Sequence, residues 1–164
     1  MTLIHDIAWI VTVGTGATAV LDLWLMGLRR LGVRSLDLAL IGRWVGHLAH
    51  GRLAHAAIAK ATPVRGECCL GWLTHYAVGV VFAGLLLLVL GREWTLAPTF
   101  LPAVAVGVGT VLAPLLLMQP AMGAGFASSR TPTPLKNSLR SVVNHGVFGV
   151  GLYVVAATIA RVAQ

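Results

Sequence analysis

The sequence predicts an all-α protein, an integral membrane four-helix transmembrane bundle with an amphipathic segment on the cytoplasmic side. Of its 164 residues, 57% are hydrophobic and only 10% are charged, whereas an ordinary soluble domain carries about 25% charged residues. The mean hydropathy of +0.86 agrees with a membrane protein. Long stretches carry no charge at all. The net charge of +7 is therefore not spread as on a nucleic-acid-binding surface, and no nucleic-acid partner is expected.

Four stretches are long and apolar enough to cross a bilayer. The hydrocarbon core, about 30 Å thick, needs roughly 20 apolar residues of helix. The stretches cover residues 7–28, 68–90, 100–122 and 141–160. The first contains a single charged residue, Asp22, and the second and third contain none. These spans leave one long loop, so we expect a single membrane domain over residues 1–164.

The basic residues indicate the orientation of the spans. Loops 29–67 and 123–140 together contain ten Lys and Arg residues, whereas the other side has only Arg92 and Arg161. Because an excess of Lys and Arg marks the cytoplasm, both termini are expected outside. The expected partners are the bilayer with its anionic head groups and either a second copy of the chain or another membrane protein.

Segment 35–60 of the first loop is predicted to contain an amphipathic helix, with Ser35 as its N-cap. Its apolar residues recur every fourth position at Leu36, Leu40, Trp44 and Leu48. Arg43, Trp44 and His47 would then lie at the membrane surface, near anionic head groups. A short helix folded against the mouth of the bundle explains the pattern equally well.

One polar side chain per span falls at a common expected depth: Asp22, His75, Gln119 and His145. A rise of 1.5 Å per residue places them roughly 5–10 Å below the cytoplasmic boundary. Ionisable groups inside a membrane are costly and mark candidate functional sites. His75 lies between Gly71 and Gly79, two gaps where another group would fit. Further polar residues are expected to support this layer, namely Thr18, Ser141 and Asn144.

Two histidines and a carboxylate are a known ligand set for a divalent transition metal. The sequence therefore favours a metal or small-solute site formed by Asp22, His75 and His145, with Gln119 and Glu67 as supporting ligands. Haem b between the two histidines is a less favoured cofactor. Two other interpretations stay open. One is a small proton-coupled transporter that uses the same three residues as a relay, and the other is a non-catalytic scaffold or assembly factor.

Other polar features rank lower. Cys68 and Cys69 beside Glu67 could capture a soft metal, but a thiol pair at the start of a helix is more often a packing element. Three loop residues are interpreted as solvated surface histidines or as a cap over the polar layer: His47, His50 and His55. Pro114 and Pro120 flank Gln119, so the third helix is expected to kink or loosen there. The sequence contains no nucleophile elbow, phosphate-binding glycine loop or carboxylate dyad, and no familiar enzyme class is indicated.

Short motifs are spread along nearly the whole chain. They are GATAVLDLW at 16–24, GRWVGH at 42–47, GWLTHY at 71–76, MQPAMG at 118–123, SSRTP at 128–132 and NHG at 144–146. Together they resemble a family of small bacterial four-helix inner-membrane proteins catalogued only as a domain of unknown function. The resemblance implies a bacterial cytoplasmic membrane and four spans, and it carries no activity. In such a membrane, the charge distribution would place both termini on the periplasmic side. The motifs include the four residues of the polar layer, which favours a shared purpose for them.

Overall fold

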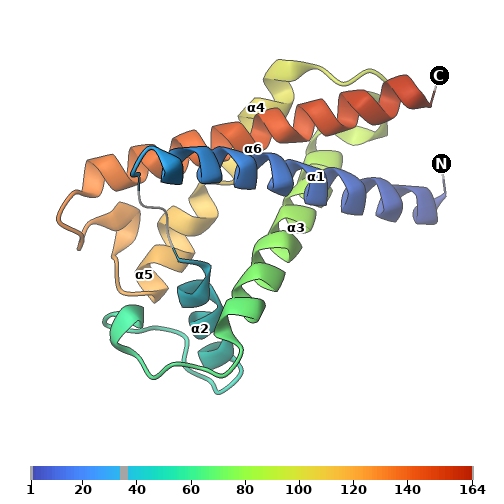
Figure 1. The fold of residues 1–164 in the computed structure, drawn as a ribbon. Coiled ribbons are helices and arrows are strands. Elements are labelled where there is room, and N and C mark those ends of the chain that lie inside the picture. The colour runs from blue at the N-terminus through green and yellow to red at the C-terminus, as the bar shows by residue number, and fades with distance from the viewer. Residues whose placement is uncertain (1, 34–36, 164) are drawn as a thin grey trace. The chain divides into compact units, whose positions relative to one another are not determined.

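The computed structural model describes residues 2–33 and 37–163, and in these residues all regular secondary structure is helical (Figure 1). Four helical stretches of the described chain are long and apolar enough to cross a membrane: α1 (Leu3–Arg30), α3 (Glu67–Leu96), the stretch Phe100–Ala121 and α6 (Pro134–Val162). The predicted all-α membrane fold is therefore confirmed, and the chain is a multi-pass membrane protein.

The third of these stretches is not one regular helix. It consists of α4 (Phe100–Gly109), a wide π-helical turn η2 (Pro114–Met118) and the short α5 (Gln119–Ala121). Proline lacks the N–H that an α-helix needs and clashes with the preceding turn. The loosening expected around Pro114 and Pro120 is present.

The chain folds as two compact units, each assembled from segments that are distant in sequence. Unit 1 comprises Met1–Arg34, Tyr76–Thr110 and Val143–Gln164, and unit 2 comprises Ser35–His75 and Val111–Val142. The single membrane domain over 1–164 stays a prediction.

Unit 1 consists of α1, most of α3, α4 and most of α6, packed around small and aliphatic side chains. Val13, Ala17, Leu86 and Leu152 are completely buried in its core. Figure 1 shows α1 and α6 running side by side. At one end of the unit, buried Asp6 of α1 forms an ion pair with Arg92 of α3.

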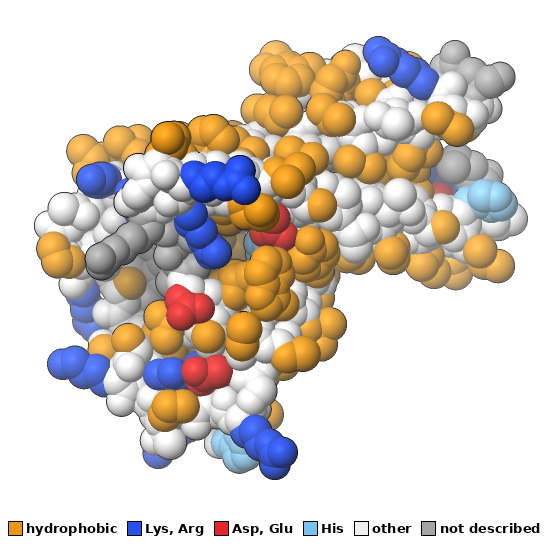
Figure 2. All heavy atoms as spheres, in the orientation of Figure 1, with side chains coloured by type: hydrophobic (Ala, Val, Ile, Leu, Met, Phe, Trp, Pro, Cys, Tyr) orange, Lys and Arg blue, Asp and Glu red, His pale blue; other side chains and the backbone are white. Residues whose placement is uncertain are grey.

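The helices of unit 1 also present large apolar side chains outward. Leu88 is 81% exposed and Leu101 is 74% exposed, and hydrophobic side chains cover much of the face in Figure 2. Soluble proteins rarely expose apolar patches larger than a few hundred Å². Lipid contact explains this surface, in agreement with the length of the helices.

Unit 2 contains α2 (Leu38–Leu48), the one-turn helices η1 (Ile58–Lys60) and η3 (Phe126–Ser128), η2, α5 and the first turns of α3 and α6. Asp37 caps α2, since its carboxylate accepts a hydrogen bond from the backbone N–H of Ala39 at 2.9 Å. The cap predicted at Ser35, like Leu36 of the apolar stripe, lies outside the described residues. The α-helix therefore occupies only part of the predicted segment 35–60.

The backbones of α2 and of the first turns of α3 lie in close contact. A Cβ atom on Gly42 would lie 1.8 Å from the carbonyl oxygen of Glu67, and one on Gly71 would lie 2.0 Å from that of Leu38. Only glycine fits at such a crossing. The amphipathic segment thus forms a helix that packs tightly on the first turns of α3.

Candidate functional site

Asp22 of α1 receives a hydrogen bond from α3. The hydroxyl of Tyr76 donates to Oδ2 of Asp22 at 3.0 Å, and both side chains are partly buried in unit 1. Between Asp6 and Arg29, Asp22 is the only charged residue of α1. A phenol hydroxyl can both donate and accept. The same contact therefore suits the carboxylate and the protonated carboxyl of Asp22.

His145 of α6 has a defined tautomer in this arrangement. The hydroxyl of Thr110 lies 2.6 Å from the carbonyl oxygen of Gly107 and 2.7 Å from Nδ1 of His145. The carbonyl can only accept, so the hydroxyl donates its proton there and accepts from Nδ1–H. A neutral His145 then carries its lone pair on Nε2, which can take a proton or a ligand.

The register of α1 and α6 brings the segments that contain Asp22 and His145 together. The indole N–H of Trp24, two residues after Asp22, donates to Oδ1 of Asn144 at 3.2 Å. Asn144 directly precedes His145. The two ionisable residues therefore lie at a similar level of unit 1. The common depth of all four polar-layer residues stays a prediction.

The two gaps expected beside His75 are filled. Thr18 occupies the space at Gly79, where an added Cβ would lie 2.0 Å from its Oγ1, and Leu38 closes the space at Gly71. Glycine at these two positions admits a neighbouring helix, and Thr18 and Leu38 are the groups that fit there. Thr18 donates its hydroxyl proton to the carbonyl of Gly14 at 2.8 Å. His75 belongs to unit 2, and its ring lies 6.1 Å from that of Trp72.

Gln119 lies in a polar cluster of unit 2. Its Oε1 accepts from the hydroxyl of Ser128 at 2.9 Å, and its Nε2 lies 3.5 Å from Oγ of Ser141. Ser128 is only 3% exposed and has a left-handed backbone with φ of 62°. Such a conformation is unusual for serine. Ser128 begins the SSRTP motif, but helical periodicity did not assign it to the polar layer, since it lies in a loop of turn-forming residues.

Comparison with known proteins identifies the family of the chain. A family model described as "Protein of unknown function (DUF2938)" matches residues 11–159. The chain belongs to the DUF2938 family. The match contains the four residues of the polar layer, and the expected membership of a domain-of-unknown-function family is confirmed. No curated protein and no solved structure matches the chain.

In this DUF2938 protein, Arg43 of α2 holds the loop before α3. Its guanidinium forms two hydrogen bonds of 2.8 Å with the carboxylate of Glu67. It also donates to three loop carbonyls, those of Ile58, Ala59 and Ala61. The bonds to Glu67 raise the pKa of Arg43 above its ordinary value. Arg43 and Glu67 therefore have structural partners, and their predicted roles at head groups and as a metal ligand stay predictions.

His47 is 7% exposed, which makes the interpretation as a solvated surface histidine wrong for this residue. Its Nδ1 lies 2.6 Å from Nε2 of His55, and its Nε2 lies 3.0 Å from the carbonyl oxygen of Thr62. His50 is exposed, with Nδ1 3.0 Å from the carbonyl oxygen of Gly46. Trp44 donates its indole N–H to the carbonyl of Leu53 at 3.0 Å.

Residues 2–33 and 37–163 contain no group of three or more His, Cys, Asp or Glu side chains that could hold a metal ion. Cys68 and Cys69 are both exposed free thiols. The chemistry that unit 1 does display is a carboxyl group beside a phenol and an imidazole with a defined lone pair. The metal set of Asp22, His75 and His145 stays a prediction.

Proposed function

We propose that this DUF2938 protein binds a small polar solute together with a proton inside the membrane, at Asp22. The observation that carries the proposal is the hydrogen bond from Tyr76 to Asp22. It places a carboxyl group and a hydroxyl together on two apolar helices. Such a pair can bind and release a proton and can also form hydrogen bonds with a solute.

His145 extends the site. With Nδ1–H bound to Thr110, its Nε2 can accept a proton or a hydrogen bond from the solute. Asp22 and His145 would form the relay of a small proton-coupled transporter. Histidine and aspartate are common members of such relays in membranes.

The charge distribution supports a location for this site. We propose that the chain resides in the bacterial inner membrane, with both termini on the periplasmic side and the two basic loops in the cytoplasm. The polar site would then open toward the cytoplasm. Anionic head groups would contact the basic loops, and no nucleic-acid partner is proposed.

Proton entry into proteoliposomes tests the proposal. Vesicles with an internal pH dye are given a pH gradient and screened with a panel of small polar solutes. We expect solute-dependent proton entry with the wild type and its loss in Asp22→Asn. Asp37→Asn is the matched control, because asparagine caps a helix as well as aspartate does. Equal proton entry in wild type and Asp22→Asn overturns the proposal.

Two further measurements on the same proteins separate the other interpretations. Stoichiometric metal after metal-replete growth, lost in His75→Ala, would establish the metal site of Asp22, His75 and His145 instead. If Asp22→Asn changes only the thermal stability and neither proton entry nor metal content, the polar layer serves as a scaffold.

A further inference from the structure

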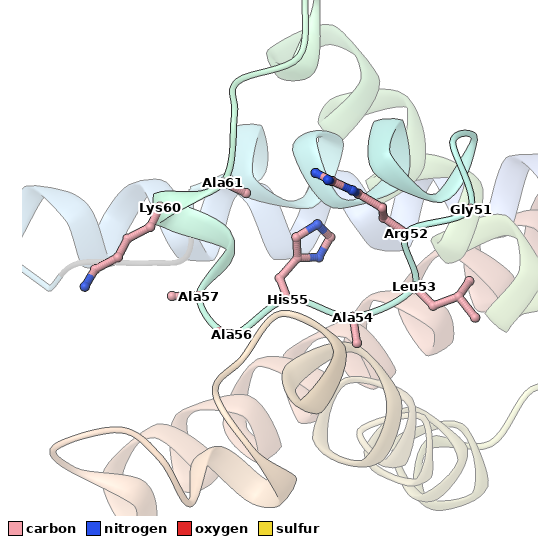
Figure 3. Close-up of a pocket in the computed structure, with 9 residues that line it drawn as sticks. All are labelled: Gly51, Arg52, Leu53, Ala54, His55, Ala56, Ala57, Lys60 and Ala61. Atoms are coloured by element: carbon pink, nitrogen blue, oxygen red, sulfur yellow. The ribbon is translucent and has the colours of Figure 1, made fainter.

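A second polar feature lies wholly in unit 2, in the loop after α2. Nine residues between Gly51 and Ala61 line a cavity of about 620 Å³ (Figure 3). The lining includes the side chains of Arg52, His55 and Lys60, and its other members are glycine, alanine and leucine. Figure 3 shows Arg52 and His55 extending to the same side of the loop, while Lys60 points in another direction. A cavity lined by basic and small apolar residues favours an anionic ligand.

The hydrogen bonds of the two histidines define which nitrogen carries a proton. Nε2 of His47 must carry a hydrogen, because the carbonyl of Thr62 can only accept. In a neutral pair, Nδ1 of His47 is then the acceptor and Nε2–H of His55 is the donor across their 2.6 Å contact. This arrangement leaves the lone pair of His55 on Nδ1. That atom is buried and has no hydrogen-bond partner among the described residues.

The two polar groups of the lining ask for different partners. The lone pair on Nδ1 of His55 requires a hydrogen-bond donor, and the positively charged Arg52 requires an acceptor. A ligand that pairs with both must therefore offer a donor and an acceptor. A phosphate group that retains one proton has P–OH and P–O groups, whereas sulfate and carboxylate ions have only acceptors near neutral pH.

We propose that this cavity binds a phosphate group, free or as the phosphomonoester headgroup of a lipid, through the charge of Arg52 and a hydrogen bond at Nδ1 of His55, with Lys60 adding to the positive potential of the lining. A buried nitrogen without a partner destabilises the free protein. A ligand that pairs with it recovers that free energy. The inference concerns unit 2 alone and does not depend on the function proposed for Asp22.

The surroundings of His55 are basic. His47 faces it from α2 and Arg52 from the loop, with Lys60 on η1 among the lining residues. The α5 segment contributes a backbone contact, since the carbonyl of Ala121 accepts from the N–H of His55 at 2.8 Å. The nearest ion pair, Arg43 with Glu67, is held at the carbonyls of residues 58–61. No carboxylate lines the cavity to compete with an anion.

The neutral histidine pair favours phosphate over sulfate. Burial lowers the pKa of His55, and the charges of His47 and Arg52 lower it further. At about pH 7.5 the ring of His55 is therefore neutral, and the hydrogen bonds of the pair leave an acceptor at its Nδ1, which repels sulfate.

Calorimetric titration of the full-length protein with inorganic phosphate and with sulfate tests the site. We expect saturable phosphate binding at about pH 7.5, at least about tenfold weaker in Arg52→Gln and in His55→Gln. Glutamine at position 55 retains a group near Nε2 but none near Nδ1. The control is Arg65→Gln, which removes an exposed positive charge of the same loop outside the cavity lining. Sulfate, which has no donor for Nδ1 of His55, should bind at least about tenfold more weakly than phosphate at this pH.

Nanodiscs identify the source of the phosphate. If free phosphate does not bind but nanodiscs with phosphatidic acid do, and both variants weaken that binding, the ligand is a lipid headgroup. Equal binding of phosphatidylglycerol, whose phosphodiester has no P–OH group, overturns the proposal. So does unchanged phosphate binding in Arg52→Gln, a variant of an exposed residue that leaves the fold intact, and so does the absence of binding to phosphate and phosphatidic acid alike.

Discussion

Tyr76 of α3 donates its hydroxyl proton to Asp22 of α1 at 3.0 Å. The residue directly before it, His75, is the one that the sequence pattern assigns to the polar layer. Consecutive residues of an α-helix point about 100° apart. In unit 1, the carboxyl group of Asp22 is therefore paired with the hydroxyl of Tyr76, a residue that the sequence pattern did not assign to the polar layer.

Removal of the phenol hydroxyl tests this pairing. Tyr76→Phe is expected to reduce the free energy of unfolding in bicelles by about 0.5–2 kcal/mol, the range for a hydrogen bond between membrane helices. It should also slow solute-dependent proton entry. Tyr153→Phe is the matched control, since it retains the ring contact with Phe100. A Tyr76→Phe protein that equals this control in both assays contradicts the role of the hydroxyl.

The tautomer of His145 is expected to depend on Thr110. Nitrogen NMR of the wild type near neutral pH should show the hydrogen on Nδ1 and the lone pair on Nε2. Thr110→Val removes the acceptor and should produce a mixture of tautomers, with a loss of about 1 kcal/mol of stability. Thr110→Ser should restore the wild-type spectrum. An unchanged spectrum in Thr110→Val would show that another group orients the ring.

The crossing of α2 and α3 predicts opposite effects of two glycine substitutions. Gly71→Ala forces a Cβ against the carbonyl of Leu38 and should destabilise the protein by about 1–3 kcal/mol. Gly27→Ala, in the last turn of α1 with nothing within 4 Å of the added atom, should stabilise it by up to about 1 kcal/mol. Chemical unfolding measures both. Equal effects would mean that α2 does not pack on α3 in this way.

Acid is expected to weaken unit 2 through His55. The pKa of this histidine is lowered from 6.5 in the folded protein, chiefly by burial. Below pH 6.5 the unfolded chain therefore binds more protons at His55 than the folded protein does. The free energy of unfolding is full above pH 6.5 and decreases as the pH falls toward the lowered pKa of the folded protein. Thermal unfolding from about pH 7.5 to pH 5 should show this loss, and His55→Gln should show less of it. A wild type and variant with parallel pH profiles would contradict the linkage.

Much of the fold could be predicted from the sequence because it depends on local properties. Apolar length alone defines the membrane-spanning helices, and proline chemistry explains the widened turn at Pro114–Met118. The packing of Gly42 on the first turns of α3 could not be predicted, since it depends on which helices meet. A glycine in a helix outside the predicted spans does not reveal its partner through periodicity.

The candidate site was harder to predict. Asp22 and His145 stand out because ionisable residues are rare in apolar helices. Tyr76 and Thr110 do not stand out, because tyrosine and threonine are ordinary in such helices and only packing decides their partners. His47 is buried because the loop after α2 folds back and places His55 against it. Helical periodicity cannot predict this contact, since His55 lies outside the helix.

The central claim is that Asp22 takes up and releases a proton inside the membrane, and infrared difference spectroscopy of the protein in nanodiscs tests it most directly. In spectra recorded with the transported solute minus those without it, we predict a protonated-carboxyl band that disappears in Asp22→Asn, persists in Asp37→Asn and shifts in Tyr76→Phe. Wild-type and Asp22→Asn difference spectra that are identical would contradict the claim.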